Sequence, residues 1–424
     1  MTRRLTILGP LLITVCGCAW LPGRNVRRVH PGQDLIAAIN AASPGHTLAV
    51  APGEYPGGTI RRSGVTVHGG GDGMVCVTGT IDLRADRVVL DGLTWEDRNG
   101  QCLEIRGRGN VVRRCVFRRF GKRGASKGIW IREDGDHGRN TIEDCLFEDW
   151  GGTAYHRSCI KIGQQGHSNA FCGTVVRRNT FRHGAVGGNN PAIQPFCPSL
   201  IEANTIHDCE DGIEVKGSHM VVRNNTVYRC HGGEAMSNRS GSHNLFEGNL
   251  LTDIPTYAWQ IWTGRANVWR NNVVARCGRI AHIKGGNRPS QRAEDALLIN
   301  NTFVGNHRGV SWHNRTCPPR NVRFVNNIFV GTGSSAIEPA GDGLYAEDYN
   351  LFFRFTSPKQ PGQHSIVGKD PQFVDAAARD YHLLPTSPAR DAGLSTGLDV
   401  PSHDRNGVPR PCGKAVDIGA CECW

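Results

Sequence analysis

The chain has 424 residues, and its 49 Lys and Arg outnumber 38 Asp and Glu to give a formal net charge of +11 at pH 7. This length suits one long solenoid or two compact domains, and the 54 glycines indicate many tight turns. No internal stretch approaches the roughly 18 apolar residues of a membrane span, which excludes an internal transmembrane helix.

The N-terminus has the pattern of an export signal. Two arginines precede a short apolar run at residues 5–15, and small residues with two cysteines follow. Residues 15–18 also resemble a bacterial lipobox, which would make Cys18 the lipidated first residue; ordinary cleavage near Ala19 is the alternative. We therefore predict a lipoprotein-like signal peptide at 1–18 and an exported protein, either a bacterial lipoprotein or a secreted or periplasmic one.

The next segment, residues 26–55, reads strand, short helix, strand. Leu35, Ile36 and Ile39 share one face at helical spacing. Because the open end of a solenoid exposes its apolar core, that end needs a cover. We predict an N-terminal capping helix within residues 34–42.

Nine copies of one short phrase follow between Asn110 and Thr332, such as NVVRRCVFRRF at Asn110 and MVVRNNTVYRC at Met220. Apolar and polar residues alternate within a copy, which indicates two short strands around a turn. We interpret the polar residue five places in as a stacked hydrogen-bonding ladder at that turn, where Asn tolerates left-handed backbone angles; a ligand track is the alternative. The ladder positions are Cys115, Cys145, Asn179, Asn204, Asn225, Asn249, Asn272, Asn301 and Asn326.

A second strand precedes each copy. Coils of this kind stack about 4.8 Å apart and share one core, which predicts an all-β, parallel β-helix solenoid. The pattern resembles the right-handed parallel β-helix proteins of the pectate-lyase-like class, and we assign this fold to residues 26–369 and a C-terminal cap or tail to 370–424. The preceding strands are Ile129–Arg132, Ile160–Gly163, Ile193–Phe196, Ile213–Lys216, Met236–Arg239, Trp259–Trp262, Ala281–Lys284 and Val310–His313.

The alternation of these strands predicts two outward columns on one flat face. Tryptophans stack on sugar rings and cations pair with carboxylates, so the face predicts a groove for an acidic polysaccharide; an inert polar face is the alternative. One column reads Trp130, Lys161, Gln194, Glu214, Ser237, Gln260, His282 and Ser311. The other reads Arg132, Gly163, Phe196, Lys216, Arg239, Trp262, Lys284 and His313. The candidate substrate-binding residues are Lys161, Gln194, Gln260, Trp262, His282, Lys284 and His313.

Residues 210–249, which begin EDGIEVKGS and include MSNRSGS, resemble the catalytic region of the alginate lyase and chondroitinase-B-like polysaccharide lyases. That family places a base Lys at the end of one strand and an Arg at the equivalent place on the next. The resemblance implies Lys216 as the catalytic base and Arg239 as its catalytic partner. His282 and Lys284 are an alternative base and cation.

The chemistry explains why such a pair is needed. β-Elimination removes the weakly acidic C5 proton of a uronate, and a cation must neutralise the adjacent carboxylate. A neighbouring like charge makes it easier for Lys216 to lose its own proton and act as a base. Arg239 could also assist the departing glycosidic oxygen.

The sequence departs from the family pattern around this pair. Ser240 follows the arginine where the family typically has His, and the alternation points Asn238 inward. Family members often bind calcium through acids upstream of the lysine, which implies a tentative calcium site at Glu214, helped by Asp211 or Gln194.

Glu214 has a second interpretation. It can instead pair with Lys216 or Lys161, and a pair with Lys216 would work against the base role.

Charge and composition limit the classes of binding partner and of enzyme activity that fit this protein. Removal of the signal lowers the net charge to about +9, which suits an acidic partner; export argues against nucleic acid, and we expect a monomer. The columns contain no Asp, which disfavours a glycoside hydrolase with clustered aspartates. The remaining hypotheses are a polysaccharide lyase, a non-catalytic carbohydrate-binding or cell-surface structural β-helix, and a uronate epimerase.

Fourteen cysteines follow Cys18, in a compartment that permits disulfides. Cys209 and Cys230 lie at one offset in successive coils, which predicts either a disulfide or stacked free thiols. Cys412 could close the tail by pairing with Cys421 or Cys423.

Overall fold

The computed structural model describes residues 25–423, apart from 98, 122–126, 133–137, 152–157, 165–171, 287, 289–290, 314–315, 332–334, 340–343, 356–357 and 359. The predicted signal peptide at 1–18, with Cys18, lies outside the described residues. Within them, no helix combines the length and apolar character needed to cross a membrane.

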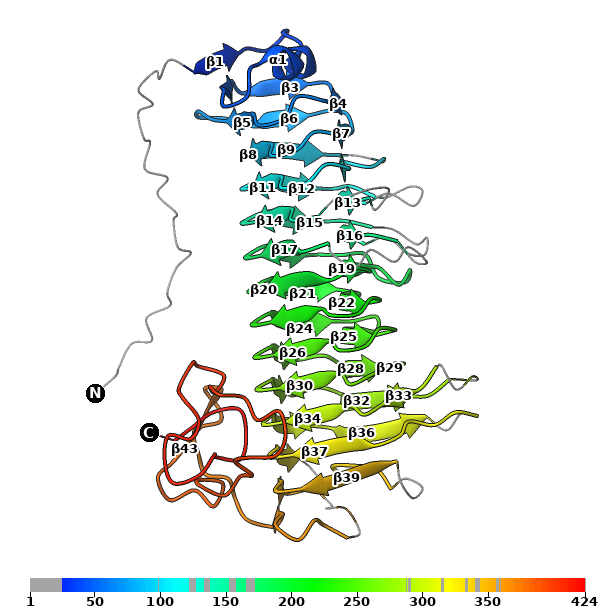
Figure 1. The fold of residues 1–424 in the computed structure, drawn as a ribbon, viewed down its shortest axis with the longest axis vertical. Coiled ribbons are helices and arrows are strands. Elements are labelled where there is room, and N and C mark those ends of the chain that lie inside the picture. The colour runs from blue at the N-terminus through cyan, green and yellow to red at the C-terminus, as the bar shows by residue number, and fades with distance from the viewer. Residues whose placement is uncertain are drawn as a thin grey trace, which may run out of the picture.

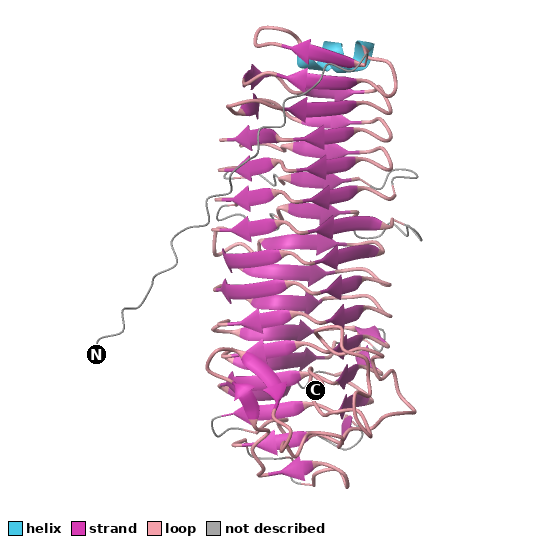
Figure 2. Ribbon diagram, turned by 90° about the vertical axis from the view of Figure 1, so that its left-hand side faces the viewer, coloured by secondary structure: helices cyan, strands magenta, loops and turns pink. Residues whose placement is uncertain are grey.

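Three parallel sheets wrap into one elongated column, and successive coils add neighbouring strands to each sheet (Figure 1). Figure 2 shows the strands stacked coil upon coil along the column. The all-β parallel solenoid predicted from the repeats is confirmed. Each of the eight predicted preceding strands coincides with a strand of one sheet, sheet C, from β13 to β36.

In spatial order, the strands of sheet A are β1 (Val26–Val29), β2 (Thr47–Val50), β5 (Thr66–Gly69), β8 (Val89–Asp91), β11 (Val111–Arg113), β14 (Thr141–Glu143), β17 (Thr174–Arg177), β20 (Ser199–Glu202), β23 (Val221–Arg223), β26 (Leu245–Glu247), β30 (Val268–Arg270), β34 (Leu297–Ile299), β37 (Val322–Val325) and β39 (Tyr345–Asp348). Those of sheet B are β3 (Gly53–Tyr55), β6 (Val75–Val77), β9 (Leu93–Glu96), β12 (Val116–Arg118), β15 (Leu146–Glu148), β18 (Thr180–Arg182), β21 (Thr205–Cys209), β24 (Thr226–Cys230), β27 (Leu250–Thr252), β31 (Val273–Ala275), β35 (Thr302–Asn306), β38 (Ile328–Gly331), β40 (Leu351–Phe353) and β41 (Ile366–Val367).

The strands of sheet C are β4 (Gly58–Ile60), β7 (Ile81–Leu83), β10 (Leu103–Ile105), β13 (Ile129–Ile131), β16 (Ile160–Ile162), β19 (Pro191–Pro195), β22 (Asp211–Val215), β25 (Glu234–Asn238), β28 (Tyr257–Ile261), β32 (Arg279–Lys284) and β36 (Arg308–His313). Two small pairs join β29 (Gly264–Arg265) to β33 (Ala293–Glu294), and β42 (Phe373–Asp375) to β43 (Asp380–Leu383).

Helix α1 (Leu35–Ala41) lies at the N-terminal end of the column, as the helical spacing predicts (Figure 1). The helix begins after Asp34, whose side chain accepts a hydrogen bond from the backbone N–H of Ala37 at 2.9 Å. Leu35 and Ile39 are buried, and Ile36 packs against the same core. The helix thus covers apolar side chains that the first coil would otherwise expose.

Aromatic rings occupy one inward position of sheet B in four successive coils. Trp95, Phe117, Phe147 and Phe181 stack with centroid separations of 4.8, 4.7 and 4.7 Å and nearly parallel planes. That spacing is the distance between neighbouring strands, so the backbone repeat itself sets the stacking. Each fully buried ring contributes about 1.5–3 kcal/mol through burial.

The predicted asparagine ladder exists, and Asn225 illustrates its geometry. Its side-chain N–H donates to the carbonyl of Ile201 at 2.9 Å and to the side-chain oxygen of Asn249 at 3.0 Å. Its own side-chain oxygen accepts from the backbone N–H of Asn204 at 3.0 Å. The ladder consists of Asn179, Asn204, Asn225, Asn249, Asn272, Asn301, Asn327 and Asn350.

Two details of the prediction were wrong. Asn327, not Asn326, is the ladder residue of the ninth copy, because the first strand of that coil begins at Val322 rather than at Asn321. The left-handed backbone angle belongs to the residue before the ladder position, as at Asn224 with φ 55°. The ladder hydrogen bonds and the left-handed backbone angle, which were predicted for one residue, therefore belong to two neighbouring residues.

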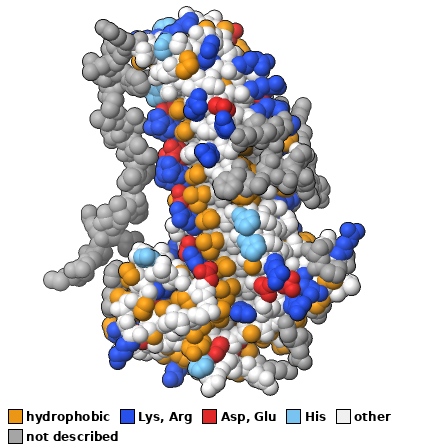
Figure 3. All heavy atoms as spheres, in the orientation of Figure 1, with side chains coloured by type: hydrophobic (Ala, Val, Ile, Leu, Met, Phe, Trp, Pro, Cys, Tyr) orange, Lys and Arg blue, Asp and Glu red, His pale blue; other side chains and the backbone are white. Residues whose placement is uncertain are grey.

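Charged side chains alternate in sign along the outward face of sheet A. Arg177 pairs with Glu143 at 2.8 Å, and Arg223 pairs with Glu202 at 2.7 Å. Figure 3 shows Lys or Arg and Asp or Glu side chains alternating along one edge of the column. The full ladder is His68, Asp91, Arg113, Glu143, Arg177, Glu202, Arg223, Glu247 and Arg270.

The C-terminal tail lies along the side of the column, next to its last coils (Figure 1). Tyr381 and Ala420 pack against Val273 and Ala275 of sheet B. Other tail residues cover outward apolar side chains of sheet A, including Leu297. The tail therefore shields apolar side chains that point away from the main core.

A fully buried ion pair between Arg410 and Glu422 holds the tail together. Arg410 also donates to the backbone carbonyls of Asp417 at 3.2 Å and Gly419 at 2.8 Å. These contacts compensate for the loss of hydration, without which a buried charge pair destabilises a fold.

The predicted disulfides are absent from the structure. Cys209 and Cys230 are register partners on β21 and β24, as predicted, yet both are free and buried thiols. Cys412 is an exposed free thiol, so it closes the tail with neither Cys421 nor Cys423. Equivalent offsets therefore stack the two side chains as free thiols, which was the alternative prediction.

Replacing a ladder residue should destabilise the solenoid. We expect Asn225→Ala to lower the free energy of unfolding by about 3 kcal/mol, because it leaves the carbonyl of Ile201 and the N–H of Asn204 buried without these partners. Urea unfolding measures the change. Asn224→Gly is the matched control, since glycine adopts the positive φ of this exposed neighbour freely and should alter stability little. Equal stability of the two variants would contradict a structural role for the ladder.

Candidate functional site

The two outward columns of sheet C are present in the structure. Strand register aligns the first column residue by residue, with Trp130 beside Lys161, Lys161 beside Gln194, Glu214 beside Ser237, Ser237 beside Gln260, Gln260 beside His282, and His282 beside Ser311. Lys216 and Arg239 follow the last residues of β22 and β25, so the pair lies on adjacent coils as predicted.

The buried carboxylate of Glu214 joins this pair. Its oxygens lie 2.9 Å from Nε of Arg239 and 3.3 Å from Nζ of Lys216. Gln194, on the preceding strand, donates its side-chain N–H to the same carboxylate. The side chain of Glu214 is 3% exposed, whereas those of Lys216 and Arg239 are 20% and 23% exposed. The acid therefore lies beneath the two cations, which face the surface.

A second buried acid, Glu234, completes the cluster. It lies 2.8 Å from the guanidinium of Arg239, and its backbone N–H donates to Asp211 at 3.0 Å. The sequence analysis did not assign Glu234 to the site. The spacing of the sequence indicates its place, however. Glu234 follows Asp211 by 23 residues, and the same separation joins Glu214 to its register partner Ser237.

Burial and like charge raise the pKa values of Asp211 and Glu234. Burial, followed by the charges of Glu234 and Glu210, raises the pKa of Asp211 to about 8. Burial also raises the pKa of Glu234, against the lowering effect of Arg239. Asp211 is therefore largely neutral near pH 7, while Glu214 has two cations beside it.

Cations and aromatic rings alternate along the surface on both sides of the pair. Lys161 stands 5.1 Å from the ring centroids of both Trp130 and Phe196, and Lys216 stands 5.7 Å from that of Phe196. In the other direction, the indole of Trp262 has two cations close to it. The guanidinium of Arg239 is 4.5 Å from its centroid, and Nζ of Lys284 is 3.7 Å away.

The remaining predicted binding residues continue this surface. The indole N–H of Trp262 donates to Gln260 at 2.9 Å, which fixes the ring. Nδ1 of His282 lies 2.8 Å from the hydroxyl of Ser311, and the ring of His313 lies 5.6 Å from the His282 ring. Burial, followed by the charges of Lys284, Arg279 and His313, lowers the pKa of His282 to about 4. His282 is therefore a neutral imidazole near pH 7.

Asn238 points inward, as the alternation predicts, and is fully satisfied there. It donates to the carbonyl of Thr263 at 2.7 Å and accepts from the side chain of Asn244 at 2.8 Å. This departure from the family pattern therefore costs the strand no hydrogen bond.

The implied calcium site does not fit the geometry. Lys216, Arg239 and Gln194 already surround the Glu214 carboxylate, and Asp211 is directed to the backbone of β25. Among the described residues, no group of three or more His, Cys, Asp or Glu side chains is arranged to hold a metal. Calcium binding here would require the cations to leave an acid that they neutralise.

The fold agrees with a known family of proteins. The family model described as the right handed beta helix region matches residues 101–277 and 158–347, together more than half of the chain. The chain therefore belongs to this family, and its solenoid is a right-handed parallel β-helix.

Solved structures with this fold include polysaccharide lyases. The PL6 family alginate lyase AlyGC is 16% identical, with a TM-score of 0.69 over 89% of this chain and 60% of that one. A mannuronic acid specific family 6 lyase from human gut microbiota is 17% identical, with a TM-score of 0.66 over 79% and 91% of the two chains. The PL6 family lyase from Pseudopedobacter saltans is 16% identical, with a TM-score of 0.62 over 82% of this chain and 94% of that one. The chain therefore has the fold of these polysaccharide lyases.

Two curated relatives, from human and mouse, carry a name that does not refer to a polysaccharide. SHC SH2 domain-binding protein 1 of Homo sapiens is 26% identical over 202 residues, which are 46% of this chain and 24% of the relative. The protein of the same name from Mus musculus is 26% identical over 191 residues, or 43% and 23%. The chain thus spans about a quarter of the length of the curated relatives it matches.

The protonated state of Asp211 predicts a pH dependence of stability. Because its pKa is raised in the folded state, this group stabilises the fold below about pH 4, and the contribution is lost as pH rises to about 8. We expect Asp211→Asn to remove this loss, so that the variant gains up to about 5 kcal/mol over the parent by pH 8. Urea unfolding from pH 4 to pH 9 measures the difference. Asp375→Asn, at an exposed position, is the control; a flat difference for both variants would mean that Asp211 is ionised.

Proposed function

We propose that this chain cleaves a uronate-containing acidic polysaccharide by β-elimination, with Lys216 as the base. The observation that carries the proposal is the Lys216–Arg239 pair on adjacent coils, held over one buried carboxylate. The likeness of the fold to alginate lyases supports the reaction class, and alginate is the first substrate to test.

Each residue has a defined task in this reaction. The C5–H bond breaks and its proton passes to Nζ of Lys216. The electron pair forms the C4–C5 double bond. The C4–O bond then breaks with its electron pair on the glycosidic oxygen, which takes a proton from water and leaves as a hydroxyl group. Arg239 neutralises the substrate carboxylate and stabilises the charge that develops on it. Glu214, 3.3 Å from Nζ, stabilises the ammonium formed when Lys216 accepts the proton.

The surrounding surface supports an acidic polymer as the ligand. The rings of Trp130, Phe196 and Trp262 offer stacking surfaces for sugars, and cations accompany each ring. A neutral polymer would use the rings but leave no role for the cations. An acidic one engages both.

One observation favours a second candidate, a non-catalytic carbohydrate-binding β-helix. Asp82 pairs with Arg84 at 2.6 Å, and Glu104 pairs with Arg106 at 2.6 Å, at the same two-residue spacing that joins Glu214 to Lys216. On this reading the Lys216 pair is one more structural ion pair of sheet C. The Glu214 pair differs in that its acid is almost fully buried and shared with Arg239.

The cellular setting and cofactor belong to the proposal. We propose export through the signal at 1–18, with lipidation at Cys18, and a monomeric enzyme that meets its polymer outside the cytoplasm. The reaction as written draws its cation from Arg239, so calcium is tested rather than assumed.

The decisive assay follows the ultraviolet absorbance of unsaturated uronate ends. The purified mature chain is incubated with alginate, pectate, chondroitin sulfate and dermatan sulfate, with and without added calcium. We expect absorbance to rise with one of these polymers and Lys216→Ala to lower the rate by about 10²–10⁴-fold, the usual contribution of a general base. Lys369→Ala, at an exposed position outside the face, should leave the rate unchanged.

The other outcomes separate the candidates. Absence of absorbance with every polymer, together with retained binding to one of them, would favour the non-catalytic candidate. Full activity of a folded Lys216→Ala would contradict the assigned base. Activity that requires calcium would contradict Arg239 as the sole cation.

A further inference from the structure

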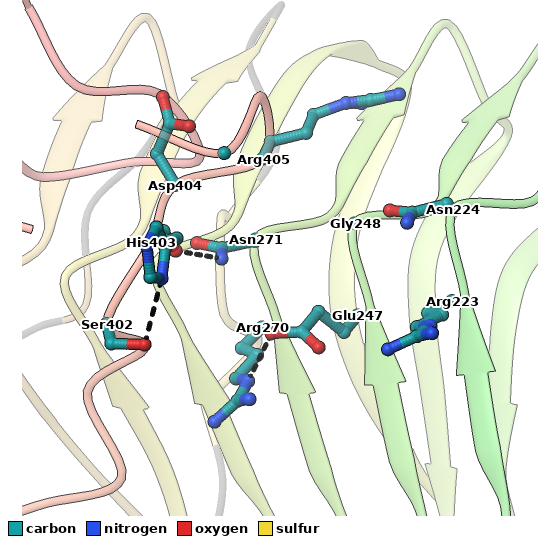
Figure 4. Close-up of a pocket in the computed structure, with 11 residues that line it drawn as sticks. Arg223, Asn224, Glu247, Gly248, Arg270, Asn271, Ser402, His403, Asp404 and Arg405 are labelled. Carbon is teal, nitrogen blue, oxygen red and sulfur yellow. Dashed lines mark hydrogen bonds and ion pairs between the residues drawn. The ribbon is translucent and has the colours of Figure 1, made fainter. Parts of the chain in front are cut away.

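A cavity of about 330 Å³ lies between the C-terminal tail and the coils of sheet A, away from the sheet C face. Figure 4 shows Arg223, Asn224 and Arg270 on the solenoid side and His403 and Arg405 on the tail side. All eleven lining residues are charged, polar or glycine. The cavity therefore suits a hydrated, polar ligand better than a hydrophobic one.

Arg405 is the unusual member of this lining. No hydrogen bond or ion pair joins its guanidinium to another described residue, although the side chain is partly buried. Burial lowers the pKa of this guanidinium from its usual value, because desolvation penalises the charge. In Figure 4 the side chain extends from the tail toward the side of the cavity on which Asn224 lies.

The other charges of the cavity are already compensated. Arg223 pairs with Glu202 at 2.7 Å, and Arg270 pairs with Glu247 at 2.7 Å. Arg270 also contacts Asp399 at 3.1 Å. A bound anion would therefore find its uncompensated positive charge at Arg405.

The carboxylate nearest in sequence does not neutralise Arg405 through a direct contact. Asp404 is buried and accepts hydrogen bonds from the backbone N–H groups of Asn406 at 2.7 Å, Val408 at 2.8 Å and Glu422 at 2.9 Å. These bonds direct its oxygens into the tail. Asp404 thus shapes the turn that carries Arg405 and leaves the guanidinium to a ligand.

We propose that this cavity binds the carboxylate of a sugar acid, with Arg405 as the anchoring cation. A planar guanidinium matches a carboxylate in geometry and charge. The amide of Asn224 and the ring of His403 provide polar partners for sugar hydroxyls, and the volume is that of a small-molecule site. A free sugar acid and the end of an acidic oligosaccharide present the same chemistry.

This site is independent of the proposed elimination. Its residues come from sheet A and the tail, whereas Lys216 and Arg239 follow strands of sheet C. Binding at Arg405 should therefore survive Lys216→Ala, and a chain without lyase activity can still possess it.

Isothermal titration calorimetry on the full mature chain tests the proposal. The probes are glucuronate, galacturonate, a tetragalacturonate, neutral glucose and inorganic phosphate, and all titrations use Lys216→Ala as the background. We expect a uronate to bind and Arg405→Met, which keeps the apolar stem of the side chain, to raise Kd at least tenfold. Arg405→Lys, which keeps the charge, should retain part of the affinity. Arg390→Met, elsewhere in the tail, is the matched control and should bind as the parent does.

The outcomes decide both the site and the source of the ligand. Equal affinity for monosaccharide and tetrasaccharide supports a site for a free sugar acid, and stronger binding of the tetrasaccharide supports a chain end. Failure of every uronate to bind overturns the proposal, as does equal binding of glucose, binding of phosphate alone, or an unchanged Kd in Arg405→Met. If Arg405→Met unfolds at a lower urea concentration than the parent, the uronate affinity of Arg405→Lys is used instead. Partial affinity supports the site, and an affinity equal to that of the parent contradicts it.

Discussion

Hydrogen bonding between successive coils, about 4.8 Å apart, is the constraint on which the rest of this structure depends. Each side chain lies directly over the residue at the same position of the next coil. Rings and amides gain from that arrangement, as the Phe117–Phe147 stack and the asparagine ladder show. Charges do not gain, because like charges at this distance repel. The sequence must therefore neutralise every charged column in one of two ways.

Sheets A and B neutralise their columns between coils. In sheet B, Arg118 pairs with Glu96 at 3.0 Å, and Arg182 pairs with Glu148 at 2.6 Å, so sign alternates up the column. Exposed pairs of this kind add little stability, but a slip of one coil would juxtapose like charges, and the alternation therefore favours one register. These faces expose balanced charge and offer no strong attraction to an acidic polymer.

Sheet C adds a second way, because it also neutralises charge within a coil, as in the Glu214–Lys216 and Glu234–Arg239 pairs. Pairs between coils, such as Glu214–Arg239, occur there as well. Side chains of the same charge can therefore occupy equivalent positions of neighbouring coils in this sheet. Lys216 lies beside Arg239, and Asp211 lies at the level of Glu234. The result is two cations at the surface above buried acids, one of which keeps its proton. A site with uncommon electrostatics thus arises from the same repeat that makes the other faces neutral.

The sequence was sufficient for what depends on periodicity. Alternation of apolar and polar residues predicts the strands of sheet C, and equal offsets in successive coils predict that Lys216 lies next to Arg239. The same reasoning failed where a shift of one residue in the alignment of a copy matters, as at Asn326 and Asn327. The sequence of that copy permits two alignments, and the start of the strand at Val322 selects one of them. It also missed Glu234, whose place in the cluster depends on the guanidinium of Arg239 reaching back over the strand.

The cavity beside the tail lay beyond the sequence for a different reason. Its two walls are separated by more than a hundred residues, and no period relates Arg405 to Asn224. Their meeting depends on the tail packing sideways, which the buried Arg410–Glu422 pair and the backbone bonds of Asp404 make possible.

The balance of charge around Glu214 governs the proposed reaction. In the structure this one carboxylate neutralises two cations, and Arg239 is the closer at 2.9 Å. A uronate that arrives at Arg239 brings a further carboxylate to a guanidinium that already contacts both Glu214 and Glu234. The demand on Lys216 runs in the opposite direction, since a base must first be neutral and its carboxylate partner favours the charged form. The same contact that opposes Lys216 at rest stabilises it once the proton has moved, and the rate of elimination depends on which effect is larger.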